Sequence, residues 1–298
     1  MALSTAITYN DAAMREDLLN VLTDLSPLET QLISGLGTSS ASSIRHEYLM
    51  DALTAVKDNA QTEGADATYH GITDPTRLYN YCQIFKQGYK VSETERAVNT
   101  AAFDDRLNYE KVKALKMLKN DMEYAVVRGS LASGQSNVAR RLAGIKVSLS
   151  LLTSASGISM TETHLNDFFQ TIWDNTATQV NAVYGDMYMK RKISAFTGGA
   201  TKNVSVVDRR LISAVDIYEA DAAQVVKLFA HRYISISGTD TNHDLLSLNE
   251  DYFKIAYLRK PEDQVSAKAG DWSGGNMVTE MTLEIRHPQA GHWAKLLL

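Results

Sequence analysis

Between Ser34 and Thr76 the chain carries few large apolar residues, and they follow no sustained helical or strand period. The large apolar residues of this stretch are Leu36, Ile44, Tyr48, Leu49, Met50, Leu53, Val56, Tyr69 and Ile72. Compact domains rarely hold unstructured connections longer than about 12–15 residues, unless these are functional or disordered. The stretch is not acidic or Pro/Gln-rich enough for simple disorder. We therefore expect an extended arm whose covering surface is supplied by another chain.

A strand is predicted directly after this sparse stretch, from Leu78 to Ser92. Aromatic and apolar residues alternate with polar ones there, which is the period of a strand. One face is expected to carry Tyr79, Tyr81, Phe85, Tyr89 and Val91, and the other Asn80, Lys86 and Lys90.

The longest predicted helix runs from Asp104 to Arg128, with acidic residues at its start and Gly129 after its end. Its apolar stripe consists of Leu107, Val112, Leu115, Leu118, Met122 and Val126, and its wet side of Lys111, Lys113, Lys116, Lys119 and Glu123. At 1.5 Å per residue this helix would be about 37 Å long, enough to form the backbone of a domain.

Shorter helices are predicted from Asp11 to Leu25, from about Ser159, and from Asp186 to Phe196. The first has the stripe Met14, Leu18, Val21, Leu22 and Leu25, and Ser26-Pro27 ends it. The second opens on an apparent capping box between Ser159 and Glu162. Its stripe is Leu165, Phe168, Phe169, Ile172 and Trp173.

Strands dominate the chain from Val180 onward. Residues 214–218 are expected to pair with 224–236, and residues 252–259 with 277–286 through the glycine-rich turn at 270–275. In the last of these strands Met277, Met281, Leu283 and Ile285 are expected to point inward, and Glu280, Glu284 and Arg286 outward.

Composition excludes several classes of protein. The net charge of −5 and the pI of about 5.8 give no overall basic field for nucleic acid or anionic membrane. The single cysteine, Cys82, rules out an intrachain disulfide framework and fits a reducing cytosol. No apolar run approaches the roughly 18 residues that span a bilayer, and no secretory signal is apparent.

Signals for cofactor or metal binding are weak. Gly35-Leu36-Gly37 lacks the third glycine of a dinucleotide fingerprint and follows no predicted strand, which favours a turn. Asp240, Asn242 and Asp244 resemble the start of a calcium loop, but Leu245 stands where that loop needs glycine. We predict no cofactor and no metal.

Catalytic candidates are equally weak. His287 and His292 flank a Pro/Gly segment that indicates a turn more than a zinc site. Cys82 has no cysteine partner, so a structural thiol is favoured over a nucleophile. Three carboxylates crowd one strand end, where charges that block self-pairing are favoured over glycoside hydrolysis: Asp216, Glu219 and Asp221.

Several short blocks occur in a characteristic order along nearly the whole chain. They are Leu25–Thr30, His46–Tyr48, Glu63–Ala67, Pro75–Leu78, Arg96–Thr100, Lys113–Lys116, Asp121–Glu123, Arg141–Gly144, Ala256–Arg259, Lys268–Asp271 and Glu280–Glu284. Their order and spacing together are specific. In this respect the chain resembles tailed-bacteriophage major capsid proteins with the Hong Kong 97-type fold.

The resemblance implies an α+β Hong Kong 97-like capsid fold. It implies an N-terminal arm at residues 1–45 and an extended loop at 46–102. A peripheral domain with a long spine helix would comprise residues 103–160 and 240–298, and an axial domain residues 161–239. Because the chain starts with Met1 and has no long helical segment ahead of the arm, a separately encoded scaffold is expected.

The implied function is that of a virion shell subunit, assembled in the host bacterial cytoplasm and not an enzyme. Hexamers and pentamers of the chain would form an icosahedral shell around double-stranded DNA, which they contact weakly, without any membrane. The implied partners are the portal, a scaffold and, where present, decoration proteins.

The residues expected at subunit interfaces are Glu63, Asp66, Arg77, Tyr79 and Tyr81. Two alternatives remain at this stage. An encapsulin-like protein cage shares the fold and holds enzymes instead of a genome. A soluble hydrolase would use the Asp216, Glu219 and Asp221 cluster.

Overall fold

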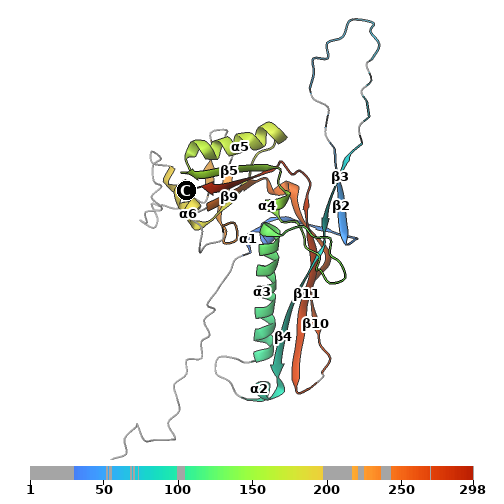
Figure 1. Ribbon diagram of the computed structural model, residues 1–298, viewed down its shortest axis with the longest axis vertical. Helices are drawn as coiled ribbons and strands as arrows, with labels where there is room; N and C mark the ends of the chain where they lie inside the picture. Colours follow the sequence, from blue (N-terminus) through green and yellow to red (C-terminus); the bar gives the residue numbers. More distant parts are fainter. Residues whose placement is uncertain are drawn as a thin grey trace, which may run out of the picture.

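The computed structural model describes residues 30–51, 53, 56–67, 69, 71–72, 74–98, 105–196, 217–220, 225–235, 243–268 and 270–297. Figure 1 shows a long helix beside one sheet, a second sheet with its own helices, and a hairpin that projects away from both. The helix predicted from Asp11 to Leu25 lies outside the described residues.

The first sheet has four strands in the order β1-β10-β11-β4. Their bounds are Gly37–Ser40 for β1, Phe253–Val265 for β10, Trp272–Ile285 for β11 and Gln83–Ser92 for β4. The predicted antiparallel pair of β10 and β11 is confirmed and is longer than expected. β1 lies parallel to β10 and covers only Lys254–Tyr257 of its outer edge. Beyond it, β10 continues through the exposed residues Arg259, Lys260, Pro261 and Glu262.

The predicted long helix is confirmed as α3, Arg106–Arg128, and it packs against β4 and β11. Asp105 caps its start, since the side chain accepts a 3.0 Å hydrogen bond from Leu107 N. Its buried residues are Ala114, Leu118, Met122, Glu123, Ala125, Val126 and Val127. Two side assignments were wrong: Val112 is 54% exposed, and Glu123 is fully buried.

Glu123 is buried because other elements close over the C-terminal half of α3. Its carboxylate accepts hydrogen bonds from Leu32 N at 2.7 Å and Ile33 N at 2.9 Å, both in helix α1, Gln31–Gly35. His231 Nε2 lies 2.8 Å from Glu123 Oε1. One side chain therefore joins α1, α3 and the segment after β8.

The second sheet has six strands in the order β5-β12-β9-β6-β8-β7. Their bounds are Leu151–Ile158 for β5, Gly291–Leu297 for β12, His243–Leu248 for β9, Ala182–Gly185 for β6, Val225–Ala230 for β8 and Ile217–Glu219 for β7. The predicted pairing of β7 with β8 is confirmed as antiparallel, whereas sequence reasoning missed β12. β5, β9 and β12 come from the ranges predicted for the peripheral domain and β6, β7 and β8 from the range predicted for the axial domain, so this sheet draws on both.

Two helices accompany the six-stranded sheet: α5, Glu162–Thr176, and α6, Met187–Phe196. Both were predicted, but the expected capping box at Ser159 is wrong, because Thr161 is the N-cap and accepts from His164 N. Trp173 is 47% exposed rather than part of the buried stripe. The remaining short helices are α2, Glu93–Ala97; α4, Ile145–Ser148; and the 3-10 turn η2, Glu250–Tyr252.

The strand predicted from Leu78 to Ser92 is two strands, β3 at Thr76–Tyr81 and β4, which separate at Cys82. In β4, Phe85 and Val91 are buried, as expected. In β3 the faces are exchanged: Asn80 is 2% exposed and Tyr79 is 41% exposed. The chain leaves the four-stranded sheet at this point, because β3 pairs with β2, Arg45–Met50, instead.

The expected outward face of β11 is also wrong for Glu280 and Glu284, which are both 5% exposed. Glu280 pairs with Arg140 at 2.8 Å and with Arg259 at 3.1 Å. α3 contacts β11, and so do β2 and β3. A simple alternation of inward apolar and outward charged residues therefore does not hold here.

Replacing Glu123 with Ala should lower the free energy of unfolding of the subunit by about 2–4 kcal/mol, because it leaves the buried amide of Leu32 and the partly buried amide of Ile33 without an acceptor. Urea unfolding of the unassembled chain measures this. Asn108→Ala, an exposed change on the same helix, is the control and should stay within about 0.5 kcal/mol. Equal stabilities of the two variants would contradict the role given to Glu123.

Candidate assembly interfaces

β2 and β3 form a two-stranded antiparallel ribbon, from Arg45 opposite Tyr81 to Met50 opposite Thr76. The residues between the two strands, from Asp51 to Pro75, contain no helix or strand where the structure describes them. The ribbon and its loop project away from the two sheets (Figure 1). This is the sparse stretch that the sequence singled out.

The base of the ribbon is held firmly to β11. Tyr48 Oη accepts a 3.2 Å hydrogen bond from Ile285 N, and His46 Nε2 lies 3.3 Å from Glu284 Oε2. On β3, the Asn80 amide donates to the carbonyls of Ala143 at 3.0 Å and Leu283 at 2.8 Å. Sequence reasoning missed these anchoring roles, although residues 45–50 carry the alternating pattern that places His46 and Tyr48 on the inner face.

The loop, by contrast, exposes its large apolar side chains. Leu53, Val56, Tyr69 and Ile72 are each at least 92% exposed, and Leu49 at the end of β2 is 66% exposed. Scattered single apolar residues are normal on surfaces, but a projecting loop whose large side chains are all uncovered lacks its packing partner. The described part of the chain supplies none for them.

The five predicted interface residues fall into two groups. Arg77, Tyr79 and Tyr81 lie on β3, where Arg77 pairs with Glu47 at 3.2 Å and the two tyrosine rings are 5.7 Å apart. Arg45 lies 4.0 Å above the ring of Tyr79. Glu63 and Asp66 are exposed in the projecting loop instead. The structure therefore brings three of these residues together and leaves two in the loop.

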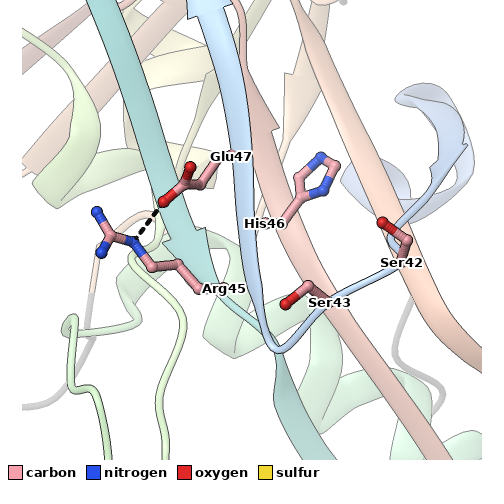
Figure 2. A pocket seen from close by; sticks show the side chains of 5 residues that line it. All are labelled: Ser42, Ser43, Arg45, His46 and Glu47. Atoms are coloured by element: carbon pink, nitrogen blue, oxygen red, sulfur yellow. Dashed lines mark ion pairs between the residues drawn. The ribbon is translucent and has the colours of Figure 1, made fainter.

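A shallow pocket of about 460 Å³ opens at the turn that leads into β2. Figure 2 shows that Arg45 and Glu47 point to one side of the strand and His46 to the other, with Ser42 and Ser43 on the turn. The two serines are not paired with the imidazole, whose Nε2 faces Glu284. The pocket therefore does not assemble a nucleophile with its base.

The other residues considered for catalysis or metal binding, Cys82, His287 and His292, have surroundings that favour a structural role. Cys82 is fully buried, and burial raises the pKa of its thiol to about 11. His292 is 2% exposed and stacks on Phe168, and burial lowers its pKa to about 4. His287 lies in a turn, as predicted, where its carbonyl accepts from Ala290 N at 3.0 Å.

The metal and carboxylate candidates gain no support from the described residues. Among these, no three His, Cys, Asp or Glu side chains are grouped to hold a metal ion. Asp244 is buried with Lys146 at 3.0 Å and Trp293 Nε1 at 3.2 Å. Asp216, Asp221, Asp240 and Asn242 lie outside the described residues. The described helices are all too short or too polar to cross a membrane.

Solved structures define the class of fold. The capsid of a native GTA particle aligns over 100% of both chains, with a TM-score of 0.66 and 9% identity. The holo-SrpI encapsulin complex from Synechococcus elongatus PCC 7942 covers 97% of this chain and 93% of its own, with a TM-score of 0.61 and 9% identity. The fold is thus that of Hong Kong 97-type shell proteins, as the sequence predicted.

The sequence assigns the family within this class. The model of the SU10 major capsid protein family matches residues 3–297, and the chain belongs to that family. The major capsid protein of Escherichia phage Phieco32 is 28% identical over 125 residues, which is 41% of this chain. The matched stretch spans 35% of that relative's length.

The Glu284 carboxylate at the ribbon base should make the free energy of unfolding depend on pH. Hydrogen bonds from His46, and then from Arg286 and Ser39, lower the pKa of Glu284 to about 2, against burial, which raises it. A carboxyl whose pKa is lowered by folding stabilises the folded state above its unfolded pKa of 4.5, and this contribution is lost as pH falls toward 2.

We therefore expect Glu284→Gln to unfold more easily than the unchanged chain at pH 7, with the difference shrinking steadily below about pH 4.5. Urea unfolding at a series of pH values measures it. Glu262→Gln, at an exposed carboxyl of β10, is the matched control and should follow the unchanged chain throughout. A Glu284→Gln deficit that is the same at pH 7 and pH 3 would contradict the assignment.

Proposed function

We propose that the chain forms a closed icosahedral shell around phage double-stranded DNA, and that its projecting loop overlaps a neighbouring subunit. One observation carries this proposal: the loop's large apolar side chains are uncovered, while its ribbon is fixed to β11. A rigid base with an uncovered end suits a part that is completed by another copy. The family to which the chain belongs supports the capsid function.

Burial of the loop would offset much of the free-energy cost of association. Fully covering one large aliphatic or aromatic side chain contributes about 1.5–3 kcal/mol. Covering all four exposed side chains, Leu53, Val56, Tyr69 and Ile72, would therefore offset a substantial part of the free-energy cost of immobilising a subunit. Many moderate contacts of this kind also suit a shell that must withstand the pressure of packed DNA.

The two sheets would correspond to the peripheral and axial domains. The four-stranded sheet with α3 would form most of the peripheral domain, and the six-stranded sheet with α5 and α6 the axial domain around the symmetry axes of hexamers and pentamers. Residues 1–45 and 46–102 would hold the arm and the extended loop; because β1 and β4 of these ranges belong to the four-stranded sheet, the arm would precede β1 and the loop would run from β2 to β3. Glu63 and Asp66 in the loop, with Arg77, Tyr79 and Tyr81 on the ribbon, would face the neighbouring subunit.

The same proposal covers the location of the subunit and its partners. The subunit would act without catalysis, assemble in the host bacterial cytoplasm and reside in the virion. Its partners would be a portal, a separate scaffold and, where present, decoration proteins, and its contact with DNA would be weak. The chain's net charge of −5 supports weak contact, since strong phosphate pairing would retard DNA movement.

A protein cage of the encapsulin kind is the second candidate, because the encapsulin structure shares the fold over 97% of this chain. The contents of purified particles separate the two. Nuclease-protected double-stranded DNA in particles from infected cells supports the capsid. Particles that hold protein cargo and no DNA would support the cage.

The loop is tested by changing Leu53, Val56, Tyr69 and Ile72 together to Ser. Since these side chains are uncovered in the subunit, its unfolding should stay unchanged, while the concentration needed for shell formation rises at least about tenfold. Light scattering and negative-stain images of the particles measure assembly.

A matched variant carries Ser at two exposed apolar positions outside the loop, Ile217 and Val265, and should assemble normally.

Deletion of residues 63–67, like the fourfold loop variant, should leave a soluble subunit that does not close shells. Normal particles from the fourfold loop variant would refute the proposed overlap.

A further inference from the structure

A groove of about 540 Å³ lies beside β4, on the face of the four-stranded sheet that is turned away from α3. It is lined by Ile84 of β4, by Ile44 just before β2, and by side chains of residues 133–140. Phe85 packs in the core with residues of α3, and neighbouring strand residues point to opposite faces, which places Ile84 on the outer face. Ile44, Ile84 and Val138 are 50%, 49% and 56% exposed. We call this site the β4 groove.

The walls of the β4 groove are fixed within the subunit. Residues 132–141 form a short hairpin, closed by paired backbone hydrogen bonds of 3.0–3.1 Å. Gly134 has a φ of +76°, and a Cβ at this position would clash with the Arg140 side chain. On the other wall, the carbonyl of Ile44 accepts a 2.8 Å hydrogen bond from Cys82 N. The groove is therefore formed before anything binds, as is usual for binding sites.

Positive charge accompanies the apolar lining. Glu280 is shared by two arginines, Arg140 at 2.8 Å and Arg259 at 3.1 Å, so this cluster has a net charge of +1. The second terminal nitrogen of Arg140, Nη1, is buried and has no acceptor among the described residues. Lys86 is exposed and shares the outer face of β4 with Ile84. The groove thus suits an apolar occupant that carries carboxylates.

The projecting loop of this chain has the complementary composition. Its large apolar side chains are Leu53, Val56, Tyr69 and Ile72, each at least 92% exposed. Residues 51–75 contain one basic residue, Lys57, and five acidic residues, which gives a net charge of −4: Asp51, Asp58, Glu63, Asp66 and Asp74. An uncovered, apolar and acidic loop therefore matches an uncovered, apolar and basic groove.

The ribbon holds the loop of each chain away from its own β4 groove. Ile44 stands at the base of β2, whereas the loop begins at Asp51, past the other end of this strand. A strand of six residues is about 20 Å long, and the ribbon projects away from the sheets (Figure 1). The loop that meets the groove therefore belongs to a different copy.

We propose that the β4 groove receives the apolar side chains of the projecting loop of a second copy, with a loop carboxylate beside Arg140. This inference rests on the proposed function and adds the surface that receives the loop. Loop and groove are different surfaces of one chain, so the contact is heterologous, and such contacts close into rings when the rotation between copies allows it. A nucleic acid would leave Ile44, Ile84 and Val138 uncovered, so a second copy fits better.

Photo-crosslinking in closed particles of the full-length chain tests the proposal. Val138→p-benzoylphenylalanine places a group in the groove that reacts, on irradiation, with whatever fills it. We expect a dimer on denaturing gels, in which mass spectrometry finds position 138 joined to a peptide from residues 51–75. Val265→p-benzoylphenylalanine is the control, since Val265 is 79% exposed and outside the groove, and it should give at least about tenfold less of this product.

Every other product of this experiment overturns the proposal. The same joined peptide in a monomer would mean that the loop folds back onto its own chain. Position 138 joined to residues 1–29 or to a different protein would give the groove another occupant, and closed particles without any product would leave it without one. Ile84→p-benzoylphenylalanine probes the same groove if the Val138 variant does not assemble. Because closed particles are the starting material, a negative result leaves shell formation itself standing.

A charge placed in the groove tests the contact independently. Val138→Asp should leave the unfolding of the half-exposed site unchanged but raise the concentration needed for shell formation at least about tenfold, since the acidic loop would bury a further carboxylate. Val138→Lys should impair assembly less, and Val265→Asp should assemble normally. Light scattering measures all three. Equal assembly of Val138→Asp and Val265→Asp would overturn the contact, and equal effects of Asp and Lys at position 138 would overturn its charge complementarity.

Discussion

A single buried carboxylate connects the main parts of this subunit. Glu123 receives two amide hydrogen bonds from α1 and one contact from His231. Because His231 Nδ1 accepts from Tyr233 N at 3.2 Å, Nε2 carries the hydrogen and donates to Glu123. A buried charge without such donors would cost several kcal/mol, so the geometry of all three elements is fixed together. α1, α3 and the segment after β8 are thus held together by one buried carboxylate.

The same division between fixed and uncovered parts recurs at the ribbon. Polar contacts at Tyr48, Asn80 and Glu284 hold its base to β11, whereas the loop presents apolar side chains that none of the described residues cover. Directional bonds set where the loop points, and in the proposed shell non-directional burial of its side chains would drive association. A second polar cluster, Asp244 with Lys146 and Trp293, ties α4 to β9 and β12 in the same manner.

The sequence predicted those features that depend on local pattern. The long helix, the pair β10 and β11, and the uncovered loop followed from periodicity or from its absence. It could not predict that Glu123 is buried, because its helical position matches the exposed Lys116 and only distant residues cover it. The exchange of faces at Cys82 was missed for a similar reason, since it arises where the chain changes partner strands. Which residues of the loop and ribbon meet a neighbour depends on a second copy and stays a prediction.

The outer edge of β10 limits the shapes that copies of this chain can build. Past the end of β1, this edge presents Arg259, Lys260, Pro261 and Glu262, all exposed. Proline cannot donate a ladder hydrogen bond, and charges oppose the approach of a second flat edge. Copies are thereby discouraged from stacking edge to edge into an open-ended fibre. In the proposed shell, growth would instead run through the loop, whose contacts with successive copies would close a finite surface.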